Sequence, residues 1–223
     1  MTNPIDFGGL RRLAPLDDHF GLGRGRPVDR HYIENFIARH APDVRGRVLE
    51  VGDAAYTLQF GAERVSTSNI LQADSGNEAA THVADLASGE GLPGDAFDCL
   101  ICTQTLQYVY PLAHAIATIH RILAPGGVLL LTVPGISQIS PYDRDRWGEY
   151  WRFTAQTLER LLGSAFDDLE INTCGNVLSA VAFLHGMACE DLTEAELDHS
   201  DTRYPVLITA RAVKAGQAFG APP

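Results

Sequence analysis

Glu50, Gly52 and Asp53 close a short apolar run, Val48 to Val51, in the order Glu-Val-Gly-Asp. Doubly wound α/β domains end a buried strand in an acidic residue and a glycine where they present backbone to a nucleotide-like ligand at the carboxyl edge of the sheet. The side-chain types and their spacing therefore predict a binding turn for a ligand of this kind.

The glycines that a dinucleotide needs are missing from this turn. A pyrophosphate must approach the main chain at a helix N-terminus, which requires the pattern Gly-x-Gly-x-x-Gly. Ala54 occupies the position of the second glycine, and its methyl group blocks a pyrophosphate more than a phosphate-free ligand. NAD is therefore a weaker candidate than S-adenosylmethionine. The alternative is a plain central strand that ends at a one-glycine turn.

Alternating strands and helices must position the turn. Apolar patterns predict strands over residues 47–51, 64–67, 81–83, 97–102, 128–133, 169–173 and 205–213, and helices over 28–40, 111–123, 154–162 and 177–187. Such alternation implies βαβ units with right-handed crossovers and a mainly parallel sheet. Residues 134–153 are polar and aromatic, and we expect them to be irregular.

Length and charge narrow the function. A chain of 223 residues suits one α/β domain, and a net charge of -11 disfavours nucleic acid and anionic membranes, whose binding needs clustered Lys and Arg. The longest apolar run, residues 128–133, cannot span a bilayer and no secretory signal is found, so we expect a cytoplasmic protein. Cys99 and Cys102 are expected as buried thiols on opposite faces of a strand, and the dispersed histidines predict no metal site.

Several short motifs occur in a recognisable order. They are Val-Leu-Glu-Val-Gly at 48–52, Ala-Asp-Leu at 84–86, Leu-Pro at 92–93, Phe-Asp-Cys-Leu-Ile at 97–101, Leu-Gln-Tyr-Val at 106–109, His-Arg-Ile-Leu-Ala-Pro-Gly-Gly at 120–127 and Trp-Arg-Phe-Thr at 151–154. Over about residues 45–162 the chain resembles a class I S-adenosylmethionine-dependent methyltransferase of the methyltransferase type 11 kind.

The resemblance implies a single-domain, Rossmann-like α/β fold with seven strands, the last of them antiparallel. It also implies three regions: an N-terminal loop and helix over residues 1–44 that cover the cofactor site, a methyltransferase domain over 45–213, and a flexible tail over 214–223. The cofactor is then S-adenosyl-L-methionine.

The resemblance also implies cofactor-binding roles for individual residues. Glu50 and Gly52 flank the methionine end, and Asp53 lies beside that turn. Asp85 accepts a hydrogen bond from the adenine amino group, with Leu86 near the ring, because an ionised carboxylate is a strong acceptor for an amino donor. The alternative for Asp85 is a helix N-cap.

The chain departs from the family pattern at the ribose and in the turn. Asn69 is the residue closest in spacing to the usual ribose-binding acid, and it lacks the charge for a bidentate grip. Tyr56 replaces the third glycine and either stacks on the ligand or closes the pocket. Arg24 or Arg26 could pair with the cofactor carboxylate, whereas Arg30 is expected on a solvated helix face.

Methyl transfer requires alignment of the acceptor and exclusion of water, with a base where the acceptor is a hydroxyl or a protonated amine. Thr103 and Gln104 follow the fourth strand and should face the sulfonium. Asp143, in the aromatic stretch, and then His185 are the candidate catalytic bases. The alternatives are a surface ion pair for Asp143 and a packed helix end for His185.

The expected function is methyl transfer to a small molecule, with an oxygen of a sugar or glycosylated metabolite as acceptor and nitrogen as the alternative atom. Both acceptor classes follow from the resemblance. A catalytically weak or inactive methyltransferase-like binding or scaffold domain is the alternative function, motivated by Ala54, Tyr56 and Asn69. A nicotinamide-dependent oxidoreductase is a third, which the missing glycines disfavour.

Overall fold

A seven-stranded sheet forms the centre of the protein, whose computed structural model describes residue 6 and residues 8–216. The strands are β1 (Gly46–Val51), β2 (Val65–Gln72), β3 (His82–Val83), β4 (Phe97–Thr103), β5 (Leu123–Pro134), β6 (Asp168–Cys174) and β7 (Leu207–Val213), in the order β3-β2-β1-β4-β5-β7-β6. All neighbours pair in parallel except β7, which is antiparallel to both β5 and β6. The predicted fold class is confirmed.

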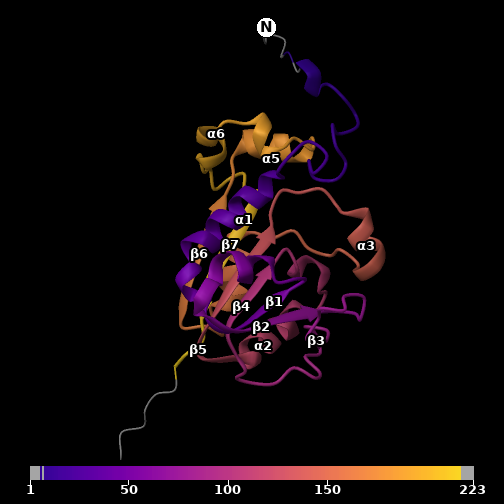
Figure 1. Cartoon of the computed structure of the whole chain (residues 1–223). Helices are drawn as coiled ribbons and strands as arrows, with labels where there is room; N and C mark the ends of the chain where they lie inside the picture. The colour runs from indigo at the N-terminus through magenta and orange to yellow at the C-terminus, as the bar shows by residue number, and fades with distance from the viewer. Residues whose placement is uncertain (1–5, 7, 217–223) are drawn as a thin grey trace, which may run out of the picture.

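Helices cover both faces of the sheet (Figure 1). The α-helices of the described residues are α1 (Val28–Arg39), α2 (Leu112–Ile122), α3 (Pro141–Trp147), α4 (Ala155–Leu162), α5 (Val177–Leu184) and α6 (Glu194–Asp198), of which α3 lies to one side of the sheet. One core lies between the sheet and α2 with α4, and a second lies between the sheet and α1 with α5. None of these helices is both long enough and apolar enough to cross a membrane, as far as the described residues go.

Alternation along the central strands supplies both cores. Leu49 and Leu100 belong to the core under α2 and α4, whereas Val48 and Ile101 belong to the core under α1 and α5. Successive side chains of a strand point to opposite faces, so a strand covered on both sides reads as a continuous apolar run. The packing therefore aligns the carboxyl ends of the parallel strands rigidly at one edge of the sheet.

The structure differs from the sequence prediction at β2, α3 and α6. Strand β2 reaches Gln72, well beyond the predicted end at residue 67. The prediction ended too early because Ser66, Thr67 and Ser68 are exposed and carry no apolar pattern. Residues 141–147 form α3 instead of irregular chain, since the Ser140 hydroxyl accepts from the Asp143 backbone N–H and Pro141 begins the helix. The short helix α6 was not predicted.

The two ends of the chain are described only in part. Residues 217–223 of the expected tail, and residues 1–5 and 7 at the start, lie outside the described residues. Lys214 still pairs with the sheet margin, donating its backbone N–H to the Gly127 carbonyl at 2.9 Å and accepting from the Gly126 N–H at 3.0 Å.

Candidate functional site

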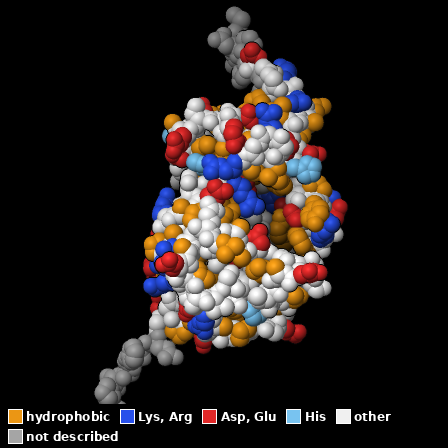
Figure 2. All heavy atoms as spheres, in the orientation of Figure 1, with side chains coloured by type: hydrophobic (Ala, Val, Ile, Leu, Met, Phe, Trp, Pro, Cys, Tyr) orange, Lys and Arg blue, Asp and Glu red, His pale blue; other side chains and the backbone are white. Residues whose placement is uncertain are grey.

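A cavity of about 990 Å³ opens at the carboxyl ends of β1, β2 and β4. Its wall is completed by residues of α1, by the segment after β3 and by the segment around α3. Figure 2 shows a hollow near the centre of this face, with hydrophobic side chains over α3 on one side of it. The carboxyl-edge placement is the one expected for a ligand site in an open parallel sheet.

Glu50 builds the turn that follows β1. Its side chain is 2% exposed, and its carboxylate accepts hydrogen bonds from the Tyr56 backbone N–H at 3.1 Å and from the Thr57 N–H and hydroxyl at 2.7 Å each. Burial raises the pKa of this carboxyl, and the three hydrogen bonds oppose that rise. The carboxylate thus holds the first turn of the short helical segment that carries Tyr56.

Gly52 gives the cavity its open floor beside this turn. Its φ of +101° is a conformation that other residues rarely adopt, and a Cβ built there would meet nothing within 4 Å. Asp53 also lines the cavity, and its side chain accepts from the Ala55 N–H at 2.8 Å. Both residues lie where the sequence predicts the ligand turn.

The structure places Asn69, which the sequence predicts as a ribose ligand, outside the cavity wall. Asn69 lies inside β2 opposite Leu49, donates its side-chain amide to the Val48 carbonyl at 3.1 Å and does not line the cavity. The last residue of β2 is Gln72, which lines the cavity and donates its amide to the Gly52 carbonyl. The choice of Asn69 followed from the underestimated length of β2, because a ligand site is expected at the carboxyl end of a parallel strand.

Asp85 and Leu86 lie together in the cavity wall after β3. The Asp85 carboxylate accepts from the Ala87 N–H at 2.7 Å, a local turn contact. No helix lies in the described segment between Asp85 and β4, so the alternative interpretation as a helix N-cap does not hold. Asp85 remains exposed to the cavity, and Leu86 is 5% exposed with its other contacts in the core. The turn contact and a ligand contact use different lone pairs of the carboxylate, so the two are compatible.

Thr103 and Gln104 end β4 in the same wall. Gln104 has a φ of +46°, and the buried Gln107 side chain donates to its carbonyl at 2.9 Å. A non-glycine residue held at positive φ by its surroundings is a common feature of ligand-binding edges.

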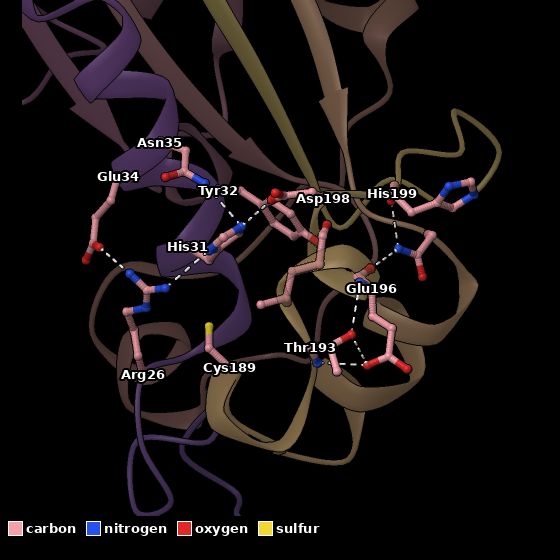
Figure 3. Close-up of polar contacts among 12 residues, drawn as sticks. Arg26, His31, Tyr32, Glu34, Asn35, Cys189, Thr193, Glu196, Asp198 and His199 are labelled. Atoms are coloured by element: carbon pink, nitrogen blue, oxygen red, sulfur yellow. Dashed lines mark hydrogen bonds and ion pairs between the residues drawn. The ribbon is translucent and has the colours of Figure 1, made fainter.

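The structure turns Arg24, which the sequence predicts as a cofactor ligand, toward the C-terminal part of the chain. Arg24 forms a two-pronged pair with Asp191, with N–O distances of 2.9 and 2.7 Å, and does not line the cavity. Arg26 lies between Glu34 and His31, whose ring also faces Asp198 (Figure 3).

The described N-terminal segment before α1 therefore packs on the C-terminal part of the chain. The Leu16 N–H donates to the His185 carbonyl at 2.7 Å, and Pro27 forms a bridge with Ala188. Only α1 reaches the cavity from this region, through Arg30 and Glu34.

Arg30 is the arginine that lines the cavity, contrary to the solvated face expected for it. It donates to the Tyr56 hydroxyl at 2.7 Å, and Tyr56 is 7% exposed and stacks on Phe60 with ring centroids 6.3 Å apart. Tyr56 thus closes one side of the cavity and orients Arg30. The sequence signal for Arg30 is its position near the start of α1, but the direction in which it points depends on how α1 crosses the sheet.

The far side of the cavity is aromatic and contains Asp143. Tyr108 donates its hydroxyl to the Asp143 carboxylate at 3.1 Å, and its ring lies 5.9 Å from that of Trp147. Burial, and then the Asp143 charge, raise the pKa of Tyr108, which keeps the phenol protonated as a donor. His185, the second candidate base, caps the end of α5 outside the cavity wall.

The residues present fit a phosphate-free nucleotide-like ligand. Gly52 leaves open space at the turn, and Arg30 is the one basic side chain among the described residues of the cavity wall. One arginine matches the single carboxylate of S-adenosylmethionine, whereas a dinucleotide pyrophosphate would find no glycine-rich cradle.

Solved structures share this fold at low sequence identity. An S-adenosylmethionine-dependent methyltransferase from Archaeoglobus fulgidus is 15% identical, with a TM-score of 0.55 over 83% of this chain and 94% of that one. The N-methyltransferase NodS from Bradyrhizobium japonicum, in complex with S-adenosylhomocysteine, is 17% identical, with a TM-score of 0.54 over 89% and 93%. The [4+2]-cyclase SpnF is 17% identical, with a TM-score of 0.57 over 92% and 88%.

Sequence comparison gives the family. No curated protein matches the chain. A family model described as a methyltransferase domain matches residues 27–173, which include α1, the turn after β1 and the aromatic wall. The chain belongs to this methyltransferase family and has the Rossmann-like fold of its S-adenosylmethionine-dependent members.

Proposed function

We propose that this protein transfers a methyl group from S-adenosylmethionine to a small-molecule acceptor bound against the aromatic wall of the cavity. The observation that carries the proposal is the open cavity at Gly52, bounded by the turn that Glu50 holds on one side and by Asp143 with Tyr108 on the other. Bound S-adenosylmethionine supplies an electrophilic methyl group, so the protein has chiefly to align the acceptor and exclude water.

The cofactor half of the cavity offers a distinct group for each part of the ligand. Gly52 and Asp53 would adjoin the methionine end, and Arg30, oriented by Tyr56, would pair with its carboxylate. Gln72 would meet the ribose at the end of β2.

The adenine would then lie beyond the ribose, against the segment that follows β3. Asp85 would accept from the adenine amino group, and Leu86 would pack beside the ring. Thr103 and Gln104 would face the sulfonium from the end of β4.

Two acceptor atoms fit the aromatic half. A hydroxyl oxygen of a sugar or glycosylated metabolite is the acceptor expected from the sequence, and the ring faces together with Asp143 support it, because a carboxylate can take the hydroxyl proton. Nitrogen is the second candidate, favoured by the excess of carboxylates over basic side chains in the described cavity wall.

Calorimetric titration with S-adenosylhomocysteine and NAD, side by side, tests the cofactor assignment. We expect S-adenosylhomocysteine to bind and NAD to bind at least tenfold more weakly. Arg30→Ala should lower the affinity for S-adenosylhomocysteine about tenfold, the weight of one charged hydrogen bond. Arg24→Ala is the matched control and should stay within twofold, because Arg24 pairs with Asp191 away from the cavity.

Tyr56→Phe separates the contribution of the Tyr56 hydroxyl from that of its ring, since it removes the hydrogen bond from Arg30 and keeps the ring. A loss of affinity with Arg24→Ala but not with Arg30→Ala would refute the assignment of the carboxylate partner. Binding without turnover on any acceptor would favour the catalytically weak or inactive binding domain instead.

A further inference from the structure

The aromatic side chains of the cavity wall are unusually exposed to solvent for large rings. Tyr108, Tyr110, Trp147 and Tyr150 all line the cavity, and the last three are 65%, 38% and 50% exposed. Tyr110 and Tyr150 lie with ring centroids 5.3 Å apart and Tyr108 and Trp147 with centroids 5.9 Å apart. Large rings left open in a concave site form a surface that a ligand can cover.

The charge of the cavity wall is predominantly negative. Its described carboxylates are Glu34, Glu50, Asp53, Asp85 and Asp143, against one basic residue, Arg30. Glu50 is used in its own turn, and Glu34 pairs with Arg26 at 2.9 Å. Asp53, Asp85 and Asp143 then stand against Arg30, and this excess of negative charge makes the field of the cavity favourable to cations and unfavourable to anions.

The arginines of α3 do not reverse this balance. Arg144 pairs with Asp145 at 2.8 Å, and the Arg146 guanidinium carbon lies 3.4 Å from the centroid of the Tyr142 ring, outside the cavity wall. Asp143 is therefore the charged side chain that the aromatic half presents to the cavity, as far as the described residues go.

We propose that the acceptor is an organic cation, a molecule with a protonated amine whose ammonium group binds against Tyr108, Trp147 and Asp143. Ring faces attract a cation, and a carboxylate within the same cluster adds a direct charge pair. The inference rests on the proposed function and narrows its acceptor class from neutral sugars to amines.

An amine acceptor gives Asp143 a defined task. A protonated nitrogen has no lone pair to accept a methyl group, so its proton must first pass to a base. The Asp143 carboxylate takes that proton, while the Tyr108 phenol, hydrogen-bonded at 3.1 Å, keeps the carboxylate oriented toward the cavity. The freed lone pair would form the N–C bond as the C–S bond of S-adenosylmethionine breaks, S-adenosylhomocysteine would leave, and Asp143 would return its proton to water.

The two tryptophans of the chain give a direct readout, because Trp147 lines the cavity and Trp151 stacks on Tyr110 with centroids 5.8 Å apart. Protein saturated with S-adenosylhomocysteine is titrated with three molecules of nearly equal shape: choline, 3,3-dimethylbutan-1-ol and 3,3-dimethylbutanoate. The change in tryptophan fluorescence gives each affinity. We expect choline to bind about tenfold more tightly than the neutral alcohol, and the anion to bind most weakly.

Variants on α3 test the carboxylate. Asp143→Asn should lower the choline affinity three- to tenfold and leave the alcohol unchanged. Asp145→Asn, two residues further along α3 and paired with Arg144, is the matched control. Its choline affinity should stay within twofold of the wild-type value. An equal effect of both variants would overturn the role of Asp143.

The remaining outcomes separate the inference from the proposed function. If S-adenosylhomocysteine binds but choline shows no advantage over the alcohol, the inference alone fails. The same titration of cofactor-free protein identifies the cause: a choline advantage seen only without S-adenosylhomocysteine means that the rings serve the cofactor sulfonium, and the inference is overturned. Tighter binding of methyl glucoside than of choline returns the site to a neutral carbohydrate. If S-adenosylhomocysteine does not bind, the proposed function falls, and the inference falls with it.

Discussion

Replacing Glu50 by glutamine is a sharp test of how the ligand turn is held. One carboxylate oxygen accepts from the Thr57 N–H and hydroxyl, and the other accepts from the Tyr56 N–H at 3.1 Å. The amide oxygen of Glu50→Gln can keep both bonds to Thr57. The amide nitrogen then faces the Tyr56 N–H, donor against donor.

The magnitude follows from that geometry. A buried N–H left without an acceptor costs about 1–3 kcal/mol. Removing a buried charge offsets part of this cost, since burial already raises the pKa of Glu50. We expect the free energy of unfolding to fall by about 1–2 kcal/mol, which shifts the melting temperature by about 2–4 °C for each kcal/mol in a chain of this size.

Urea unfolding and calorimetry with S-adenosylhomocysteine measure the two consequences together. The Tyr56 N–H lies in the turn that shapes the cavity, so cofactor affinity should fall along with stability. Glu63→Gln, an exposed glutamate on the same connection, is the control and should change stability by less than about 0.5 kcal/mol. Wild-type stability and affinity in Glu50→Gln would refute the role assigned to this carboxylate.

Three further substitutions probe the cofactor edge and the sheet. Gly52→Ala should cost about 1–2 kcal/mol of stability, measured by urea unfolding, because a φ of +101° strains any side chain, and its methyl group should weaken S-adenosylhomocysteine binding. Gln72→Ala should lower that affinity three- to tenfold in calorimetry while Asn69→Ala does not; the reverse order would restore the ribose role to Asn69. The Arg47 guanidinium donates hydrogen bonds to the Asp98 carboxylate and holds the pKa of Asp98 below its ordinary value. The pair therefore stabilises the fold at pH values above the pKa that Asp98 has in the unfolded chain. This contribution is lost as the pH falls through the lower pKa of Asp98 in the folded protein. Between about pH 5 and pH 2 the free energy of unfolding should therefore fall further in wild type than in Asp98→Asn, by a few tenths of a kcal/mol up to about 1 kcal/mol, since the pair is partly exposed. Parallel curves would show that the pair contributes nothing.

The architecture was predictable because its signal is local. Strands covered on both faces are apolar throughout, as in residues 97–102 and 128–133, and helix α1 shows a regular apolar spacing that ends at Ala41-Pro42. Polar β2 was predicted too short, because an exposed strand lacks the apolar pattern. Helix α3 was missed because its residues are polar and aromatic and its start depends on a serine cap.

The same distinction between local and distant contacts applies to the site residues. Positions fixed by strand ends, such as Gly52 and Thr103, lie in the cavity wall as predicted from the carboxyl-edge rule. Positions on connecting segments depend on distant contacts: Arg24 is drawn away by Asp191, 167 residues later in the chain.

The sequence by itself determined the sheet and the ligand turn and made a pyrophosphate the weaker candidate ligand, because each depends on residues within a few positions of one another. Only the tertiary structure decided that Arg30 and Gln72 line the cavity and that Tyr108, Asp143 and Trp147 form one cluster. Those placements depend on the crossing of α1 over the sheet, on the true length of β2 and on the packing of α3 against the segment after β4. Contacts between elements far apart in the chain leave no periodic signal in the sequence.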